Sequence, residues 1–143
     1  MLPIELIATD SQQPVVHDLR VLFADDDPVN KAIGRYIFEC LGYRADIVGD
    51  GVEALAALRR SSYDVVLMDL WMPMLDGYAT ARRIRSELPR KQQPRIIAMT
   101  ASDAFDERAR CLAAGMDDFL SKPFCIEELD GLLRRVQRLR QAG

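Results

Sequence analysis

A short apolar run that ends in a carboxylate constrains this chain more than any other feature. Residues Val65 to Met68 read Val-Val-Leu-Met, Asp69 follows them directly, and Pro73 then breaks the pattern. Four apolar residues in succession predict a strand buried on both faces, as in a parallel sheet that helices cover on both sides. A carboxylate at the end of such a strand is presented at the edge of the sheet.

Three other strand-like runs also end in polar side chains. They are Leu19–Ala24 before Asp25 and Asp26, Ile96–Met99 before Thr100, and Phe119–Ser121 before Lys122. The segments between the runs have helical spacing, and this βα alternation predicts one open, doubly wound α/β sheet. Ligands of such sheets bind outside the carboxyl ends of the strands, so we expect the five polar side chains to converge there.

Capping signals predict where the helices begin and end. Asp27 followed by Pro28 predicts the start of the first helix, which we expect to end near Gly42. Asp50 and Glu53 have the spacing of a capping box for the second helix. The first helix is expected to bury Val29, Ile33 and Ile37, and the last helix Ile126, Leu129, Leu132, Leu133, Val136 and Leu139. The other expected elements are strands at 43–48 and 117–121 and helices at 78–88, 102–115 and 125–140.

Composition limits the class of protein. The chain has 143 residues, which suit one domain, and 49% are hydrophobic, which excludes a largely disordered chain. A net charge of -3 offers no overall basic field, so we expect no direct binding of nucleic acid. No basic leader and no apolar run of about 20 residues is present, which predicts a cytoplasmic protein without a membrane segment. We expect residues 1–18 to be an arm or linker and residues 19–141 to be the domain.

The remaining side chains have simple expected roles. Cys40, Cys111 and Cys125 are odd in number and far apart, so they are interpreted as small core residues and not as a zinc site. Met68, Met72, Met74 and Met99 are interpreted as packing residues. His17 is the only histidine and lies in the arm, so no histidine phosphotransfer site is expected. A solvated helix face is favoured over an acidic partner for Arg134, Arg135, Arg138 and Arg140.

Four motifs in order give the chain a family resemblance. They are Asp25-Asp26, the stretch from Met68 to Gly77 around Asp69, Met99-Thr100-Ala101, and Ser121-Lys122-Pro123-Phe124. Over about residues 19 to 140 the chain resembles the receiver (CheY-like) domains of two-component response regulators and hybrid sensor histidine kinases. The resemblance implies a flavodoxin-like (βα)5 sandwich with a five-stranded parallel sheet in the order 2-1-3-4-5.

The same resemblance implies a magnesium-dependent phosphoacceptor site. Asp69 would take a phosphoryl group from a phosphohistidine of a sensor histidine kinase or a histidine phosphotransfer protein. Asp26, Asp69 and the backbone carbonyl of Trp71 would ligate Mg²⁺ directly, with Asp25 ligating through water. Lys122 would neutralise the phosphoryl group, aided by a cis Lys122-Pro123 bond. Such a chain is not a conventional enzyme, but it promotes its own phosphorylation and dephosphorylation.

The resemblance also implies a switch and an output face. The hydroxyl of Thr100 would move to a phosphoryl oxygen, and Phe119 holds the position of the aromatic residue that swings inward. A static core phenylalanine is the alternative for Phe119. A downstream protein would bind the face from about Ser102 to Arg140, since no output domain is recognisable after Gly143. A homodimer, and whether the chain is a stand-alone regulator or a fragment of a hybrid kinase, stay open.

Two positions control access to the expected site. Ala101 leaves the approach to the phosphoryl group clear, and Trp71 is bulky where small polar residues are frequent. We hypothesise that the Trp71 indole shields the acyl phosphate from water.

Three rival functions are weighed against the receiver. A haloacid-dehalogenase-like phosphohydrolase needs a second acid two residues after its nucleophile, and Trp71 stands there. A phosphorylation-independent pseudo-receiver scaffold is opposed by the complete acidic set. A flavodoxin-type FMN protein would need a phosphate-binding loop after the first strand, where this chain has three acids. Asp25 to Asp27 alone would fit a solvated helix cap.

Overall fold

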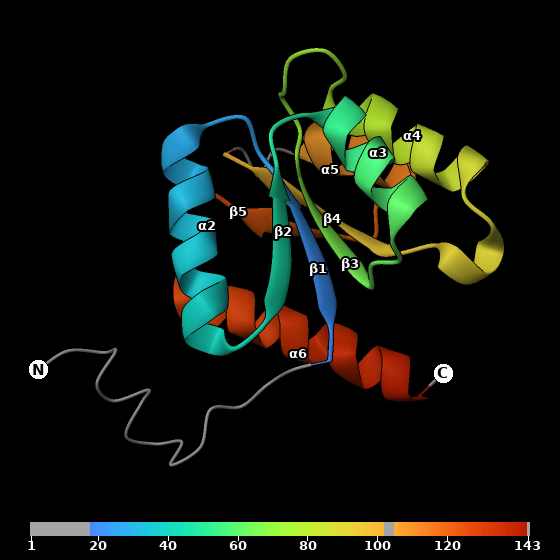
Figure 1. Cartoon of the computed structure of the whole chain (residues 1–143). Coiled ribbons are helices and arrows are strands. Elements are labelled where there is room, and N and C mark those ends of the chain that lie inside the picture. Colours follow the sequence, from blue (N-terminus) through green and yellow to red (C-terminus); the bar gives the residue numbers. More distant parts are fainter. Residues whose placement is uncertain (1–17, 102–104, 143) are drawn as a thin grey trace, which may run out of the picture.

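The computed structural model describes residues 18–101 and 105–142, which form five parallel strands and the helices that cover them (Figure 1). The strands are β1 (Arg20–Ala24), β2 (Arg44–Val48), β3 (Val65–Asp69), β4 (Arg95–Thr100) and β5 (Asp118–Ser121). They pair in the order β2-β1-β3-β4-β5, which confirms the predicted fold class and strand order. The expected arm at residues 1–18, apart from Asp18, and the expected helix start at Ser102-Asp103 lie outside the described residues.

Helices lie on both faces of the sheet. On one face are α2 (Pro28–Leu41) and α6 (Ile126–Ala142). On the other are α3 (Gly51–Arg60), α4 (Gly77–Glu87) and α5 (Phe105–Ala113), and a short 3-10 turn, η1 (Arg90–Gln92), connects α4 to β4. No helix within the described parts of the chain has the length and apolarity that crossing a membrane requires.

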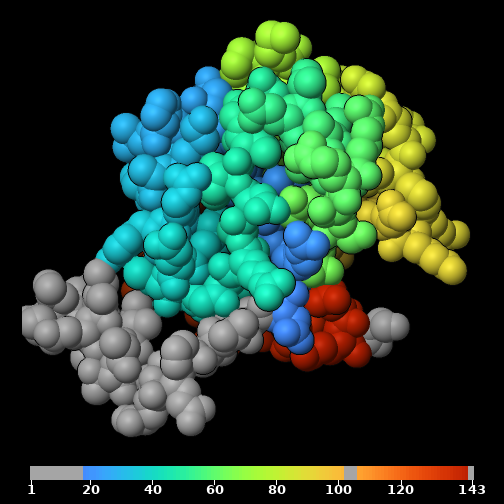
Figure 2. Space-filling model, in the orientation of Figure 1, coloured from blue at the N-terminus to red at the C-terminus, as the bar shows by residue number. Residues whose placement is uncertain are grey.

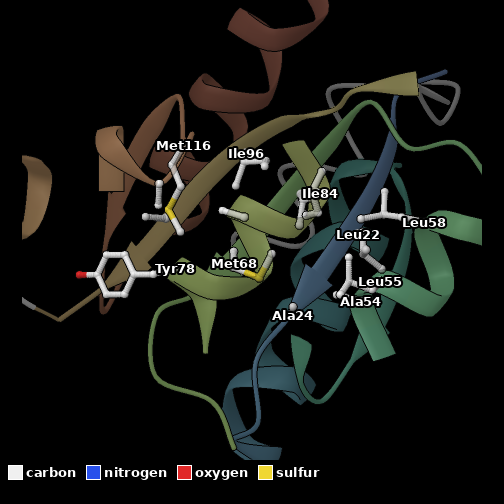
Figure 3. Close-up of a cluster of buried hydrophobic side chains, with 14 of the residues drawn as sticks. Leu22, Ala24, Ala54, Leu55, Leu58, Met68, Tyr78, Ile84, Ile96 and Met116 are labelled. Carbon is white, nitrogen blue, oxygen red and sulfur yellow. The ribbon is translucent and has the colours of Figure 1, made fainter. Parts of the chain in front are cut away.

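Alternation along the strands builds two cores. In β1, Val21 and Phe23 pack toward α2 and α6, whereas Leu22 and Ala24 pack toward α3, α4 and α5. Figure 3 shows the core on the side of α3, α4 and α5, which extends over that face of the sheet from Leu58 to Tyr78 and Met116. Every residue of β3 is buried, as its continuous apolar sequence predicts.

Helix α2 begins and ends where its capping signals place it, but it buries only part of the predicted face. Asp27 accepts a hydrogen bond from the N–H of Val29, and the helix ends at Gly42 with a φ of 82°. The prediction that Val29 and Ile33 are buried is wrong, since they are 63% and 47% exposed. Ile37 is buried as predicted, and Gly34 and Phe38 complete the buried face. The reason is close packing, because a Cβ on Gly34 would lie 3.0 Å from the Phe23 ring of β1.

Other local predictions are confirmed or corrected. Asp50 caps α3 by accepting from the N–H of Glu53, but the Glu53 carboxylate accepts from the N–H of Gly49, one residue before the cap. The apolar face of α6 is buried from Leu129 to Val136 and half-buried at Ile126, whereas the prediction for Leu139 is wrong, since it is 53% exposed. Cys111 is buried as predicted and Cys40 is half-buried, but the prediction of a core residue is wrong for Cys125, which is exposed before the start of α6. Met68, Met72 and Met99 pack in the core, whereas Met74 is 82% exposed in the loop after β3.

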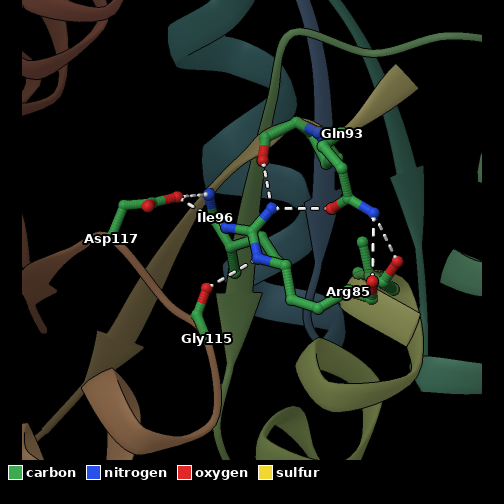
Figure 4. A network of polar contacts seen from close by, with 7 residues as sticks. Arg85, Gln93, Ile96, Gly115 and Asp117 are labelled. Carbon is green, nitrogen blue, oxygen red and sulfur yellow. Dashed lines mark hydrogen bonds and ion pairs between the residues drawn. The ribbon is translucent and has the colours of Figure 1, made fainter. Parts of the chain in front are cut away.

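Arg85 joins α4 to the starts of β4 and β5 (Figure 4). Its Nε donates to the carbonyl of Gly115 at 2.8 Å, and Nη1 donates to the Gln93 side chain and the Pro94 carbonyl at 2.8 Å each. Nη2 pairs with Asp117, whose carboxylate also accepts from the N–H of Ile96. This network fixes the end of the sheet opposite the predicted site.

Candidate functional site

Three carboxylates meet at the carboxyl ends of β1 and β3. Ala24 and Met68 are partners across these neighbouring strands, so the residues that follow them, Asp25 and Asp69, are placed side by side. Asp25, Asp26 and Asp69 each offer an oxygen within 4.8 Å of the other two. Asp25 and Asp69 are buried and Asp26 is exposed, so the cluster lies between the core and the surface.

Asp25 is held by contacts on both of its oxygens. Oδ1 accepts from the N–H of Asp27 at 2.9 Å, and Oδ2 accepts from the Asn30 amide at 3.3 Å. Oδ2 also pairs with Lys122 Nζ at 3.0 Å. Sequence reasoning gave Asn30 no role, although its place in the first turn of α2 would have put it over the strand end.

Lys122 comes from the loop after β5 and completes the cluster. Its Nζ lies 3.2 Å from Asp69 Oδ1 and also contacts Asp25, and the side chain is mostly buried. The Lys122-Pro123 peptide bond is cis, as predicted. Burial opposes the charge of Lys122, but the hydrogen bond to Asp25 and the charges of Asp69 and Asp25 outweigh burial and raise its pKa. The ammonium therefore stays protonated beside the acids.

The charges and donor atoms around Asp69 are suited to binding a cation. Burial raises the pKa of Asp69, Lys122 lowers it and Asp25 raises it, with a net increase. Lys122 pairs with two of the three carboxylates, so the cluster has an excess of negative charge. An all-oxygen donor set at the surface edge suits a hard divalent cation such as Mg²⁺, which keeps several of its waters. The residues present therefore fit the metal that the sequence predicts.

The loop after β3 lies close against Asp69. The N–H of Trp71 points to Asp69 Oδ1 at 3.5 Å, which is long for a hydrogen bond. The Trp71 indole is 58% exposed and packs edge-on against Tyr78 with 5.7 Å between ring centroids. A Cβ on Gly77 would lie 2.4 Å from the Asp69 carbonyl oxygen, so only glycine allows the start of α4 to approach this closely. Gly77 was not among the predicted site residues.

The two expected switch residues both contact α5. Thr100 follows Met99, the partner of Asp69 across β3 and β4, and its buried hydroxyl donates to Glu107 Oε1. Phe119 is half-buried, and the Arg108 guanidinium lies 4.9 Å from its ring centroid. Ala101 is exposed. Glu107 and Arg108 were missed because nothing in the linear sequence relates an α5 side chain to particular residues of β4 and β5.

Comparison with known proteins agrees with this geometry. The family model described as "Response regulator receiver domain" matches residues 21–134. The sensor histidine kinase RcsC of Salmonella typhi is 35% identical over 94% of this chain, and the response regulator MprA of Mycobacterium leprae is 38% identical over 84% of it. The chain spans 14% of RcsC and 51% of MprA.

A solved structure supports the same relationship. The receiver domain of the sensor histidine kinase PA1611 from Pseudomonas aeruginosa PAO1 has a magnesium ion coordinated in its active-site cleft. It is 39% identical to this chain with a TM-score of 0.75, covering 83% of this chain and 97% of that one. On its fold, its acidic cluster and these matches, the chain belongs to the response regulator receiver domain family.

Proposed function

We propose that this chain is the phosphoacceptor of a two-component phosphorelay and takes a phosphoryl group onto Asp69. The donor would be a phosphohistidine of a sensor histidine kinase or of a histidine phosphotransfer protein. The observation that carries the proposal is the Lys122 ammonium placed between Asp25 and Asp69, 3.0 and 3.2 Å from their oxygens. A nucleophilic carboxylate beside a fixed cation is what phosphoryl transfer to an aspartate requires.

The transfer is a single displacement at phosphorus. An Asp69 oxygen forms the new O–P bond while the N–P bond to the donor imidazole breaks, and the imidazole keeps the electron pair. Lys122 holds the Asp69 carboxylate before the reaction and pairs with the phosphoryl oxygens afterwards. The product is an acyl phosphate, so the chain acts once per phosphoryl group and is not a conventional multiple-turnover enzyme.

Asp26, Asp69 and the Trp71 carbonyl would hold Mg²⁺ directly, with Asp25 acting through water. The contacts of both Asp25 oxygens with Asp27, Asn30 and Lys122 support this indirect role. When bound, Mg²⁺ would offset the negative charge of the acids and of the phosphoryl oxygens. This is the reason to expect that phosphorylation depends on the metal.

Phosphorylation would be read out through α5, β5 and α6. Thr100 and Phe119 lie where β4 and β5 meet α5, and both contact that helix. Movement of the Thr100 hydroxyl toward the phosphoryl group would therefore disturb the α5 surface. We propose that a downstream protein binds the face from about Ser102 to Arg140 in the phosphorylated state.

Incubation with Mg²⁺ and acetyl phosphate, followed by intact-mass measurement, tests the proposal. One base-labile phosphoryl adduct is expected on the wild type and none on Asp69→Asn. Asp27→Asn is the matched control: it changes a neighbouring acid outside the cluster, and asparagine still caps α2. It should be phosphorylated like the wild type.

Other results would contradict the proposal. An adduct that persists in Asp69→Asn would place the reaction elsewhere, and multiple-turnover release of phosphate from monoesters would indicate a hydrolase. No adduct with acetyl phosphate or with any phosphorylated histidine kinase or phosphotransfer domain would favour a scaffold.

A further inference from the structure

The hydroxyl of Thr100 is bonded to an acid that the proposed chemistry does not use. It donates to Oε1 of Glu107, in the first turn of α5. Thr100 is buried at the end of β4, and Glu107 is half-buried above it. A hydrogen bond from a hydroxyl to a carboxylate is stronger than one between neutral groups, because the acceptor is charged.

This bond and the proposed phosphorylated state compete for one proton. A threonine hydroxyl has a single hydrogen and can donate to one strong acceptor at a time. If that hydrogen turns to a phosphoryl oxygen on Asp69, the Glu107 carboxylate loses its donor in a partly buried place. The exchange therefore has a cost that depends on Glu107.

The neighbouring residue of α5 holds the second switch residue. Arg108 covers the ring of Phe119 with 4.9 Å between guanidinium carbon and ring centroid. Consecutive residues of one helix thus contact both Thr100 and Phe119. Loss of the Glu107 contact would loosen the same turn of α5 that carries Arg108.

We propose that Glu107 is a positioning residue that restrains Thr100 in the unphosphorylated chain and makes phosphorylation compete with a contact to α5. This inference rests on the proposed function, because it assigns the Thr100 hydroxyl the role of hydrogen-bond donor to the phosphoryl group on Asp69. Glu107 sets how strongly the phosphoryl group must attract the Thr100 hydroxyl before that hydroxyl leaves the Glu107 carboxylate. Because Glu107 belongs to α5, its release couples the movement of Thr100 to that helix.

The test is binding of beryllofluoride, a phosphoryl mimic, in the presence of Mg²⁺. Titration is followed by the fluorescence of Trp71, the only tryptophan, and by calorimetry. Glu107→Gln keeps the shape and removes the charge of the acceptor, so it should bind beryllofluoride about fivefold more tightly than the wild type. Asp106→Asn removes the same charge from the adjacent exposed acid and should leave the affinity unchanged.

A double-mutant cycle separates this role from a general structural or electrostatic effect. Thr100→Val removes the hydroxyl, and in that background Glu107→Gln should give no further gain. A gain that persists without the hydroxyl, or an equal gain in Asp106→Asn, would overturn the inference.

The same titration distinguishes the two proposals. Wild-type binding that is lost in Asp69→Asn supports the proposed function, and unchanged affinity in Glu107→Gln then refutes the role of Glu107 alone. Absence of Asp69-dependent binding in the wild type refutes both.

Discussion

Asp25 and Asp26 are adjacent in sequence but differ in what surrounds them. Asp25 is fully buried, and its two oxygens accept from the N–H of Asp27, the Asn30 amide and Lys122. Asp26 is exposed at the mouth of the cluster. The two acids therefore suit different tasks: Asp25 orients Lys122, and Asp26 faces the solvent from which a hydrated cation arrives.

Gly77 is the residue whose side-chain size matters most near Asp69. Gly77→Ala places a methyl group 2.4 Å from the Asp69 carbonyl oxygen and 2.9 Å from Leu70 Cα, so the backbone of β3 must shift. We expect a loss of about 1–3 kcal/mol in the free energy of unfolding, as for other overpacked sites, and slower phosphorylation. Urea unfolding and the initial rate with acetyl phosphate measure the two effects.

Gly131→Ala is the control for Gly77→Ala. A Cβ on Gly131 meets nothing within 4 Å, and the residue lies inside α6. This variant should gain up to about 1 kcal/mol from helix propensity and keep the wild-type rate. If Gly77→Ala has the same free energy of unfolding and the same phosphorylation rate as Gly131→Ala, the close approach of α4 to Asp69 has no functional role.

A substitution of Trp71 tests whether an exposed indole beside the site slows hydrolysis of the acyl phosphate. The backbone N–H of Trp71 faces Asp69 and its ring packs edge-on against Tyr78, so the indole is anchored at the mouth of the site. Trp71→Asn should shorten the half-life of the phosphorylated chain several-fold, because water reaches the acyl phosphate more easily. The decay of the phosphorylated mass after removal of the donor measures this.

Met74→Asn is the matched control for Trp71→Asn, since Met74 is the most exposed apolar side chain of the same loop. Its half-life should equal that of the wild type. Equal half-lives for Trp71→Asn and the wild type would remove the shielding hypothesis.

At the scale of elements, α2 presents an apolar stripe made of Val29, Ile33 and Tyr36. These side chains are 63%, 47% and 48% exposed at helical spacing. The helix begins directly after the acid run and forms part of the surface in Figure 2, where it is coloured blue to cyan. In the proposed phosphorelay, a protein donor would bring its phosphohistidine to Asp69 and would contact the elements beside it. We predict that an apolar patch of the donor binds this stripe.

Ile33→Asp should therefore weaken transfer from a protein donor. With the phosphorylated histidine phosphotransfer domain that reacts fastest with the wild type, we expect kcat/KM to fall about fivefold or more, as for a residue central to an interface. The rate with acetyl phosphate should not change. Leu139→Asp, at an exposed apolar position of α6, should leave both rates unchanged. An equal loss with acetyl phosphate would show damage to the site and not to docking.

The same helix explains one limit of sequence reasoning. The capping residues Asp27 and Gly42 predict the ends of α2, because capping depends on local backbone geometry. The buried face depends on which residue lets the helix approach the sheet. That residue is Gly34 against Phe23, a contact between two elements that periodicity alone does not contain.

For the whole molecule, the positions of the site residues were predictable and most of their partners were not. Alternating βα units place strand ends at one edge of a parallel sheet, so Asp25, Asp26, Asp69 and Lys122 were expected to meet, and they do. Contacts such as Thr100 with Glu107, or Arg85 with Asp117, depend on how helices lie over the sheet. Only the folded chain supplies that information.

Binding at the acid cluster should stabilise the whole domain. A ligand at 100 times its Kd that binds only the folded chain adds about 2.7 kcal/mol to the free energy of unfolding. Mg²⁺ with beryllofluoride at that excess should therefore raise the Tm by about 10 °C, measured by calorimetry, and EDTA should abolish the increase. Asp69→Asn should show no increase.

Arg85→Leu is the control that separates global stability from the site. It leaves the carbonyls of Gly115 and Pro94 without their donor and should lower the Tm with and without ligand, by an amount corresponding to about 1–3 kcal/mol. Because the network fixes the opposite end of the strands, the increase on adding Mg²⁺ and beryllofluoride should match that of the wild type. An Arg85 variant that folds but loses the increase would show that the two ends of the sheet are coupled, contrary to the separation argued from the structure.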